Sequence, residues 1–266
     1  MAAPIVSLQN PRIKSLVRLR QRRERDQTAR FLIEGYRELR RAVDRRVTIE
    51  ALYVCGDLFL GSNEPQLIGE ASAMGAEIIE LGPEAFKKVS YRDRPEGLIA
   101  VAKQFETSLE SIESPDDPLF LVVESIEKPG NLGTMLRTAD AAGVSAVIVT
   151  DPTTDPFNPN VVRASLGCLF TVPLAIASTA EALAWLGRAN VRTIATTPDT
   201  PTLLWDTDLS GPLAIVVGSE QYGLSKEWLT GADERARIPM GGEADSLNAA
   251  MAAGVALFEA VRQRSG

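Results

Sequence analysis

The stretch Leu119–Ala139 reads LFLVVESIEKPGNLGTMLRTA and indicates the fold more clearly than any other part of the chain. Its five leading apolar residues predict a buried strand. A polar loop follows, and residues 131–142 are expected to form a helix that ends at Gly143. A second apolar run, Ala146–Val149, predicts the next strand. The order strand, loop, helix, strand is typical of a mostly parallel sheet covered by helices.

The same alternation continues towards the end of the chain. Further strands are predicted at 169–176, 191–195, 213–217 and 236–239, and further helices at 160–165, 179–186, 226–229 and 246–264. This alternation places the fold in the α/β class, and we expect one domain over 118–266.

Residues 1–105 predict a second, smaller α/β domain. Helices are expected at 12–25, 37–46, 66–74 and 83–89, and strands at 31–35, 51–54, 77–81 and 98–101. Residues 106–117 are polar and acidic, and Pro118 follows them. This composition predicts a linker between the two domains.

Basic charge is concentrated near the start of the chain. The formal net charge is −7, but residues 1–50 hold 13 of the 28 Lys and Arg residues and six of the 35 Asp and Glu residues. A basic segment neutralises phosphates, so this part is a candidate RNA-binding surface. The candidate contacts are Arg18, Arg20, Arg22 and Arg23. A solvated helix face explains the same charge pattern and stays open as an alternative.

Composition also excludes several kinds of site. The chain has no histidine, which excludes a Ser-His-Asp triad, a histidine proton shuttle and the usual histidine-ligated zinc sites. Its two cysteines, Cys55 and Cys168, suggest neither a zinc cluster nor a disulfide scaffold, so we expect no metal and a cytoplasmic location. We expect no membrane span, because no apolar run reaches about 18 residues. The first nine residues lack the features of a secretory signal.

Three segments that follow predicted strands carry polar residues and glycines. They are 124–139, quoted above, Val217–Ser225, which reads VGSEQYGLS, and Ile238–Asn248, which reads IPMGGEADSLN. Ligands of open α/β sheets bind outside the carboxyl ends of the strands, so we expect these segments to form one pocket. None of them contains Gly-x-Gly-x-x-Gly or a Walker A sequence, so familiar dinucleotide and P-loop sites are not expected.

The three segments together resemble the three motifs of the SpoU/TrmH family of RNA 2′-O-ribose methyltransferases. The matching patterns, in order, are Asn-x-Gly followed by Arg-Thr-Ala, Gly-x-Glu-x-x-Gly-Leu-Ser, and Ile-Pro-Met-x-Gly with Ser-Leu-Asn. This resemblance covers residues 118–266. Ile33–Gly35 and Pro95–Ala100 also resemble the substrate-binding domain that often precedes this catalytic domain, which has an L30e-like fold.

The resemblance implies an activity and an architecture. The activity is transfer of a methyl group from S-adenosylmethionine to a ribose 2′-hydroxyl of RNA. The architecture is that of SPOUT proteins, with a deep trefoil knot at the C-terminal end of the catalytic domain. The family implies a homodimer with the active site near the subunit interface. Ribosomal RNA is favoured as substrate because a separate RNA-binding domain is commoner among relatives that modify it, and transfer RNA stays open.

The resemblance also implies catalytic residues. Arg137 corresponds to a residue that contacts the target ribose or its phosphate. A guanidinium stays protonated up to about pH 12, so we expect Arg137 to stabilise the developing alkoxide rather than to accept its proton. Glu220 is expected to orient Asn131 or Arg137. Asn131 and Ser246 are also candidate helix N-caps, and Asn248 would lie in the first turn of the last helix.

Cofactor and RNA contacts complete the implied site. The candidate cofactor-binding residues are Thr196, Gly218, Ile238, Met240 and Leu247. Arg163 also falls on a family pattern, as a candidate contact of an RNA phosphate or the active-site loop, and a surface salt bridge is the alternative.

Two other functions stay open. One is a non-catalytic RNA-binding protein that retains the fold, and the other is a methyltransferase that acts on a base or on protein. Presence of Asn131, Arg137, Glu220 and Asn248 argues against the non-catalytic alternative.

Overall fold

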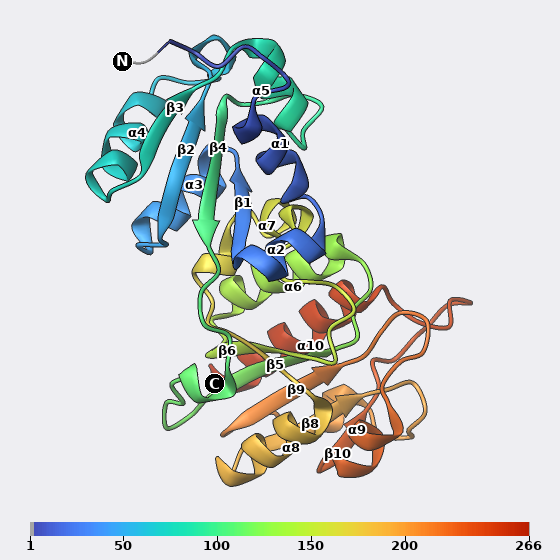
Figure 1. Cartoon of the computed structure of the whole chain (residues 1–266). Coiled ribbons are helices and arrows are strands. Elements are labelled where there is room, and N and C mark those ends of the chain that lie inside the picture. The colour runs from blue at the N-terminus through green and yellow to red at the C-terminus, as the bar shows by residue number, and fades with distance from the viewer. Residues whose placement is uncertain (1–2, 266) are drawn as a thin grey trace. The chain divides into compact units, whose positions relative to one another are not determined.

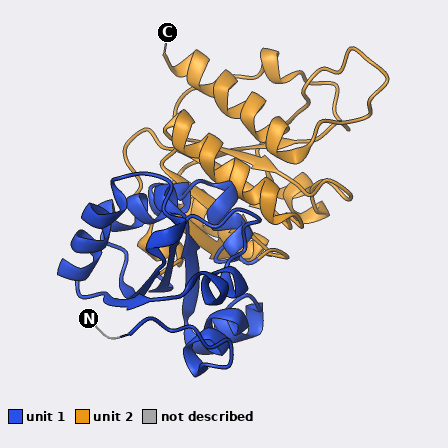
Figure 2. Cartoon of the chain, turned by 90° about the horizontal axis from the view of Figure 1, so that it is seen from above, with its two compact units in different colours: residues 1–105, 155–171 blue, residues 106–154, 172–266 orange. Residues whose placement is uncertain are grey.

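The computed structural model describes residues 3–265, and its helices and strands can be followed in Figure 1. The chain divides into two compact units, drawn in blue and orange in Figure 2. Unit 1 contains residues 1–105 and 155–171, and unit 2 contains residues 106–154 and 172–266. No pattern in the sequence indicated that residues 155–171 group with the N-terminal part.

Unit 1 is built on a four-stranded mixed sheet in the order β1-β4-β2-β3. Strand β4 pairs antiparallel with β1 and β2, and β2 pairs parallel with β3. The strands are β1 (Arg30–Glu34), β2 (Ile49–Val54), β3 (Glu77–Glu80) and β4 (Leu98–Lys103). The helices that follow strands are α3 (Tyr36–Asp44), α4 (Glu64–Ala73) and α5 (Pro83–Val89), with a 3₁₀ turn at Gly56–Leu58.

The helix predicted over 12–25 is wrong in its extent, because the segment forms two helices. They are α1 (Pro11–Arg18) and α2 (Arg22–Thr28). The break has a physical cause in Arg25, which is 1% exposed. Its Nη1 donates to the backbone oxygens of Leu19 and Arg20, both at 2.9 Å. This guanidinium therefore satisfies carbonyl groups at the end of α1 that a continuous helix would have used internally.

Residues 155–171 pack into unit 1 through the same arginine. The Nε of Arg25 donates to Asp155 Oδ2 at 2.7 Å, and both side chains are buried. The rings of Phe31 and Phe157 lie 5.0 Å apart. The segment contains helix α7 (Pro159–Ala164), as predicted, but 169–176 is not a single strand. It forms a 3₁₀ turn at Cys168–Phe170 and only later a short strand.

Unit 2 contains a six-stranded sheet in the order β10-β8-β9-β5-β6-β7. Every pair of neighbouring strands is parallel, which confirms the predicted fold class. The strands are β5 (Leu119–Glu124), β6 (Ala146–Thr150), β7 (Leu174–Ala177), β8 (Arg192–Thr196), β9 (Leu213–Val217) and β10 (Glu234–Ala236). All six residues of β5 are buried, as expected for a central strand covered on both faces.

Helices cover both faces of this sheet. They are α6 (Pro129–Ala142), α8 (Thr179–Arg188), α9 (Lys226–Gly231) and α10 (Ala249–Arg264). Helices α6 and α10 pack side by side (Figure 1). Residues of α8 and α9, among them Leu186 and Trp228, share a buried cluster with Phe120 and Val122 of β5.

The segment predicted as a linker belongs to unit 2 and packs against its sheet. Residues 109–111 form a 3₁₀ turn, and Leu109 and Ile112 are 6% and 8% exposed. Both belong to the buried cluster that contains Phe120 and Trp228. The backbone N–H of Ile176 donates to the Thr107 oxygen at 2.7 Å. This segment is therefore anchored to the sheet rather than free in solution.

Two helix starts differ from the prediction and position the site. Helix α6 begins at Pro129, and its N-cap is Lys128 rather than Asn131. Proline is favoured at the first helical position because its fixed φ suits the helix. Helix α10 begins at Ala249, and its N-cap is Asn248 rather than Ser246. The Oδ1 of Asn248 accepts from the N–H groups of Ala250 and Met251, which satisfies two otherwise unpaired donors.

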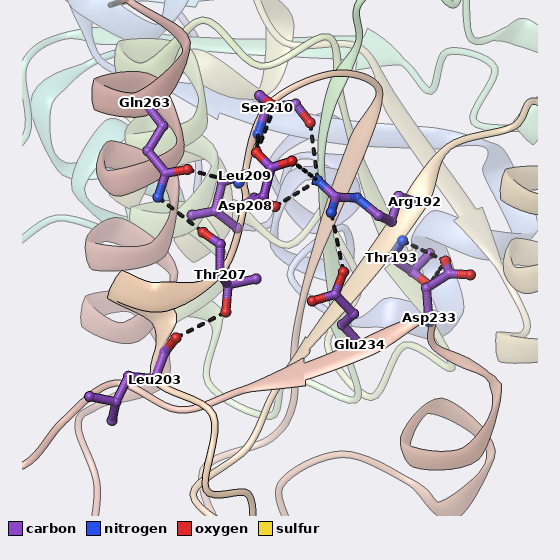
Figure 3. A network of polar contacts seen from close by, with 10 residues as sticks. All are labelled: Arg192, Thr193, Leu203, Thr207, Asp208, Leu209, Ser210, Asp233, Glu234 and Gln263. Atoms are coloured by element: carbon purple, nitrogen blue, oxygen red, sulfur yellow. Dashed lines mark hydrogen bonds and ion pairs between the residues drawn. The ribbon is translucent and has the colours of Figure 1, made fainter.

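A polar network ties the outer strands of the sheet to the C-terminal helix (Figure 3). Arg192 of β8 binds Glu234 of β10 at 3.1 Å. The backbone N–H of Leu209 donates to Gln263 of α10 at 2.8 Å. The contacts of Gln263 tie the C-terminal end of α10 to the segment between β8 and β9. No helix in the described part of the chain is long and apolar enough to cross a membrane.

Candidate functional site

The three motifs of unit 2 place three polar side chains against one another. Asn131 lies in the first turn of α6, Glu220 in the loop after β9, and Asn248 at the start of α10. Asn248 Nδ2 lies 2.6 Å from Glu220 Oε1 and 3.4 Å from Asn131 Oδ1. Asn131 Nδ2 also donates to Glu220 Oε1. Strands β5 and β9 are parallel neighbours, which is why the loops that follow them meet at one edge of the sheet.

Lys128 is a fourth member of this cluster, and the sequence analysis missed it. Its Nζ donates to Glu220 Oε2, and its side chain is 67% exposed. The hydrogen bond to Glu220 raises the pKa of Lys128 above its usual value. A cation at a helix N-terminus is unfavourable, and the paired carboxylate offsets this. The only sequence clue was a basic residue directly before the helix proline.

Glu220 thus accepts hydrogen bonds on both carboxylate oxygens. Oε1 receives the amides of Asn131 and Asn248, and Oε2 receives Lys128. These hydrogen bonds connect Glu220 to the first and third motifs and to the residue before α6. The arrangement therefore fits a residue that orients its neighbours.

Arg137 and Ser246 lie outside this hydrogen-bonded cluster. Arg137 is exposed on α6, and among residues 3–265 no hydrogen bond or ion pair involves its side chain. Its guanidinium is available to a bound anion. Ser246 is exposed in the loop before α10.

Gly218 occupies a position that admits only glycine. A Cβ built there would lie 2.2 Å from the backbone carbon of Gly223. Backbone hydrogen bonds between Ser219 and Gly223, at 3.0 and 3.1 Å, close the loop on itself. The absence of a side chain at Gly218 therefore allows the two ends of this loop to pack directly against each other at the end of β9.

The other candidate cofactor residues border the same part of unit 2. Thr196 ends β8, and its Oγ1 donates to the Val216 oxygen of β9 at 2.8 Å. Ile238 and Met240 are half-buried in the segment after β10, and Leu247 is 37% exposed. Their backbone groups lie on the polypeptide that connects β10 to α10.

Glu124 is a second residue that the sequence analysis missed. It ends β5, is 4% exposed, and its Oε2 accepts from the backbone N–H of Ser225 at 2.7 Å. Thr179 Oγ1 donates to the other oxygen at 3.2 Å. This buried carboxylate anchors the second motif to the central strand. Its sequence clue was a charged residue at the end of an apolar run.

The candidate RNA-binding arginines of α1 and α2 differ in their availability. Arg20 donates to the backbone oxygens of Lys88 and Ser90 at 2.9 and 2.8 Å and lies over the Tyr91 ring. It therefore has a structural role within unit 1. Arg23 is exposed, and the described residues offer its side chain no hydrogen bond or ion pair.

The remaining candidate arginines are exposed but differ in their partners. Arg18 pairs with Glu24 at 3.4 Å and Arg22 with Asp26 at 3.6 Å. Arg163 is exposed in the last turn of α7. It belongs to unit 1, whereas the sequence analysis expected it in the domain over 118–266. Within residues 3–265 no group of three or more acidic or cysteine side chains could hold a metal ion.

Comparison with known protein families identifies both parts of the chain. Residues 118–258 match the SpoU rRNA Methylase family. Residues 10–100 match the MRM3-like substrate binding domain. The two matches fall on the halves of the sequence that were predicted to form separate domains.

Individual relatives agree with these matches. The chain is 36% identical over 202 residues to the 23S rRNA (guanosine-2′-O-)-methyltransferase RlmB of Ralstonia nicotianae, which covers 73% of this chain and 80% of the relative. A crystal structure of an RNA 2′-O ribose methyltransferase is 42% identical, with a TM-score of 0.87 over 99% of this chain and all of the other. An AdoMet-bound rRNA methyltransferase from Sinorhizobium meliloti is 34% identical, with a TM-score of 0.90 over 98% of this chain and 97% of the other.

These matches extend over nearly the whole chain and include its three motifs. Together with the structural matches they agree with the parallel sheet of unit 2. The chain belongs to the SpoU rRNA methylase family.

Proposed function

We propose that this protein transfers the methyl group of S-adenosylmethionine to a ribose 2′-hydroxyl of RNA. The observation that carries the proposal is the hydrogen-bonded cluster of Asn131, Glu220 and Asn248. Three motifs distant in sequence supply its members, as in the methyltransferases that the chain resembles. Relatives named for 2′-O-methylation, and one structure named for bound AdoMet, support the same activity and cofactor.

The loop around Gly218 fits the proposed cofactor. A side chain at Gly218 would collide with Gly223, so this glycine fixes the course of the loop at the end of β9. We propose that Gly218, with backbone groups of Ile238, Met240 and Leu247, binds the adenosine part, and that Thr196 borders it. When bound, S-adenosylmethionine supplies a sulfonium methyl group that an oxygen nucleophile can attack.

The chain's own residues would act mainly by positioning. In the displacement, the ribose oxygen forms a bond to the methyl carbon, the sulfur–methyl bond breaks, and the hydroxyl proton is released. Glu220 holds Asn131 and Asn248 in one orientation, so their amides can fix the nucleotide near the methyl group. Arg137 is free to place a permanent positive charge beside the developing alkoxide and the adjacent phosphate. Ser246, exposed beside Asn248, is a further candidate contact.

Ribosomal RNA is the substrate class that we favour over transfer RNA. The N-terminal match to a substrate-binding domain and the names of the relatives support this choice. We propose that residues 1–105 bind structured RNA, with Arg18, Arg22 and Arg23 facing its phosphates. Arg20 Nη2 donates to the backbone oxygens of Lys88 and Ser90 within unit 1, so its contribution would be structural. Arg163 is a further candidate phosphate contact. Action on ribosomal RNA implies a cytoplasmic location.

We further propose a homodimer and a trefoil knot, as the family resemblance implies. Helix α10 supports the dimer, because Met251 and Phe258 are 60% and 50% exposed. They are seven residues apart, so both lie on one side of the helix. Large exposed apolar side chains on one helix face are typical of a contact with another chain.

The activity is tested with purified protein, methyl-labelled S-adenosylmethionine and ribosomal RNA, followed by digestion of the RNA to nucleosides. We expect the label in a 2′-O-methylated nucleoside. Label only in a base-methylated nucleoside would contradict the ribose assignment. No transfer, combined with no heat of S-adenosylmethionine binding in calorimetry, would identify a non-catalytic RNA-binding protein.

A further inference from the structure

Unit 1 contains a cleft that the proposed catalytic site does not use. Its volume is about 400 Å³. It lies between the start of α3, the loop before α4 and the segment 92–96, and Leu166 also lines it. A volume of this size lies in the range of small-molecule pockets, about 300–1,000 Å³.

Part of the charge in this cleft is already neutralised. Arg92 pairs with the buried Glu38 at 2.8 Å and also with Glu96. Glu96 accepts in addition from the backbone N–H of Tyr36, at the start of α3, at 3.2 Å. A carboxylate therefore already occupies the N-terminus of α3, where a free phosphate would otherwise be attracted. These contacts argue against a simple anion site.

Glu64 is the group that lacks a partner. It is 4% exposed, and its Oε1 accepts from the backbone N–H of Gly61 at 2.8 Å. Its Oε2 is buried and has no hydrogen-bond partner among the described residues. Buried polar atoms are nearly always hydrogen-bonded, so a water molecule or a ligand has to supply a donor to this oxygen.

The other walls of the cleft suit a flat ring attached to a phosphate. Tyr36 is half-buried, and Leu60 is 76% exposed, so an aromatic and an apolar surface border the cleft. Arg37 is exposed, and within residues 3–265 its side chain has no hydrogen bond or ion pair. A neutral ring with a hydrogen-bond donor could face Glu64 while a phosphate approaches Arg37.

We propose that this cleft binds one unpaired RNA base that carries an exocyclic amino group, with an adjoining phosphate at Arg37. The proposal rests on the proposed function, because that function makes RNA the substrate. Unpaired bases are recognised by stacking on aromatic side chains and by hydrogen bonds to their edges. A carboxylate accepts a hydrogen bond from the amino group of cytosine. Uracil has a carbonyl oxygen at the same position, and the carboxylate would repel that oxygen.

Binding of two fluorescein-labelled RNA decamers to the full chain tests this. One is oligocytidylate and the other oligouridylate, so they differ at the amino position and the neighbouring ring nitrogen. We expect the oligocytidylate to bind at least about 5-fold more tightly, the lower limit for one well-placed base contact.

The Glu64→Gln variant should remove or reverse this preference. Its amide oxygen can keep the Gly61 contact, so its amide nitrogen replaces Oε2 and donates to uracil.

Arg37→Ala should weaken both decamers alike and lower the salt dependence of binding by about one phosphate. Glu84→Gln, which changes a 79% exposed carboxylate of α5, is the matched control and should keep the wild-type preference.

Equal or undetectable binding of the two decamers by the wild-type chain would overturn the proposal. An unchanged preference in Glu64→Gln would also overturn it. Calorimetry with S-adenosylmethionine should give wild-type binding in Glu64→Gln, because the cleft lies in unit 1 and the proposed cofactor loop in unit 2. A cytosine preference without ribose methylation would support base binding in the cleft and contradict the proposed methyl transfer.

Discussion

Glu220 shows how one carboxylate can organise a site whose members are far apart in sequence. Its hydrogen-bond partners Lys128, Asn131 and Asn248 are separated from it by 92, 89 and 28 residues. The Glu220 carboxylate connects all three of these side chains. We therefore expect the carboxylate to contribute to the reaction by positioning these side chains relative to the substrate.

Replacement of Glu220 by Gln should lower turnover while cofactor binding stays near that of the wild type. The amide keeps the size of the side chain but loses the charge that pairs with Lys128. Hydrogen bonds to a charged group contribute about 1.5–3 kcal/mol, so we expect kcat to fall about 10- to 150-fold. Single-turnover methyl transfer measures this. Glu227→Gln, an exposed carboxylate on α9, is the control, and wild-type turnover in Glu220→Gln would remove the positioning role.

Sequence motifs predicted Asn131, Glu220 and Asn248 but not Lys128 or Glu124. The first three stand in patterns that recur across the family, so the resemblance identified them. Lys128 and Glu124 acquire their roles only from distant partners, Glu220 and the N–H of Ser225. Spacing along one chain cannot show which side chains will face each other across a sheet.

At the scale of elements, the loop after β9 depends on Gly218. Substitution by Ala would place a Cβ 2.2 Å from the Gly223 backbone, so the loop would have to move. We expect Gly218→Ala to destabilise the protein by about 1–3 kcal/mol and to weaken S-adenosylmethionine binding. Gly241→Ala is the matched control in the third motif, because its Cβ would meet nothing within 4 Å. Equal calorimetric affinities for the two variants would contradict the proposed cofactor role.

Segment 155–171 depends on the buried pair of Arg25 and Asp155. Removal of one partner leaves the other charge buried and unpaired, which typically costs about 3–5 kcal/mol. We therefore expect Asp155→Ala to lower the free energy of unfolding by about that amount in a urea titration. Lys87→Ala, which breaks an exposed pair with Glu84, should cost at most about 1 kcal/mol. Similar midpoints for the two variants would show that the pair does not hold this segment.

Sequence patterns predicted most elements of the fold but not all of their limits. The helix at 83–89 and the strand at 213–217 begin and end where they were expected. The helix over 12–25 was wrong because Arg25 satisfies the carbonyl groups where α1 ends. The Arg25 side chain reaches back along the chain to make this contact. Hydrophobic periodicity cannot predict it, because periodicity indicates only which face of an element is buried.

At the scale of the whole molecule, the parallel sheet was predictable but its strand order was not. Alternating strands and helices indicate the class. The order β10-β8-β9-β5-β6-β7 depends on contacts between distant segments, as does the grouping of 155–171 with unit 1. Knots are rare among folds, so only the family resemblance suggested the trefoil knot, which stays a prediction.

The proposed homodimer predicts that charge on the exposed face of α10 will separate the subunits. Met251→Glu and Phe258→Glu each place a carboxylate where a partner would bury an apolar side chain. We expect the wild type to sediment as a dimer and these variants to shift towards the monomer. Met74→Glu, at a 42% exposed methionine of unit 1, is the control and should leave the dimer intact. A wild-type monomer would contradict the dimer.

A map of ribose methylation across total RNA tests the central claim most directly. The map is compared among cells with the wild-type protein, cells without it, and cells with Arg137→Ala, with Arg188→Ala as an exposed control. We predict that specific 2′-O-methyl groups, in ribosomal RNA, disappear without the protein and in Arg137→Ala but persist in the control. Identical maps with and without the protein would contradict the assignment of RNA 2′-O-methylation.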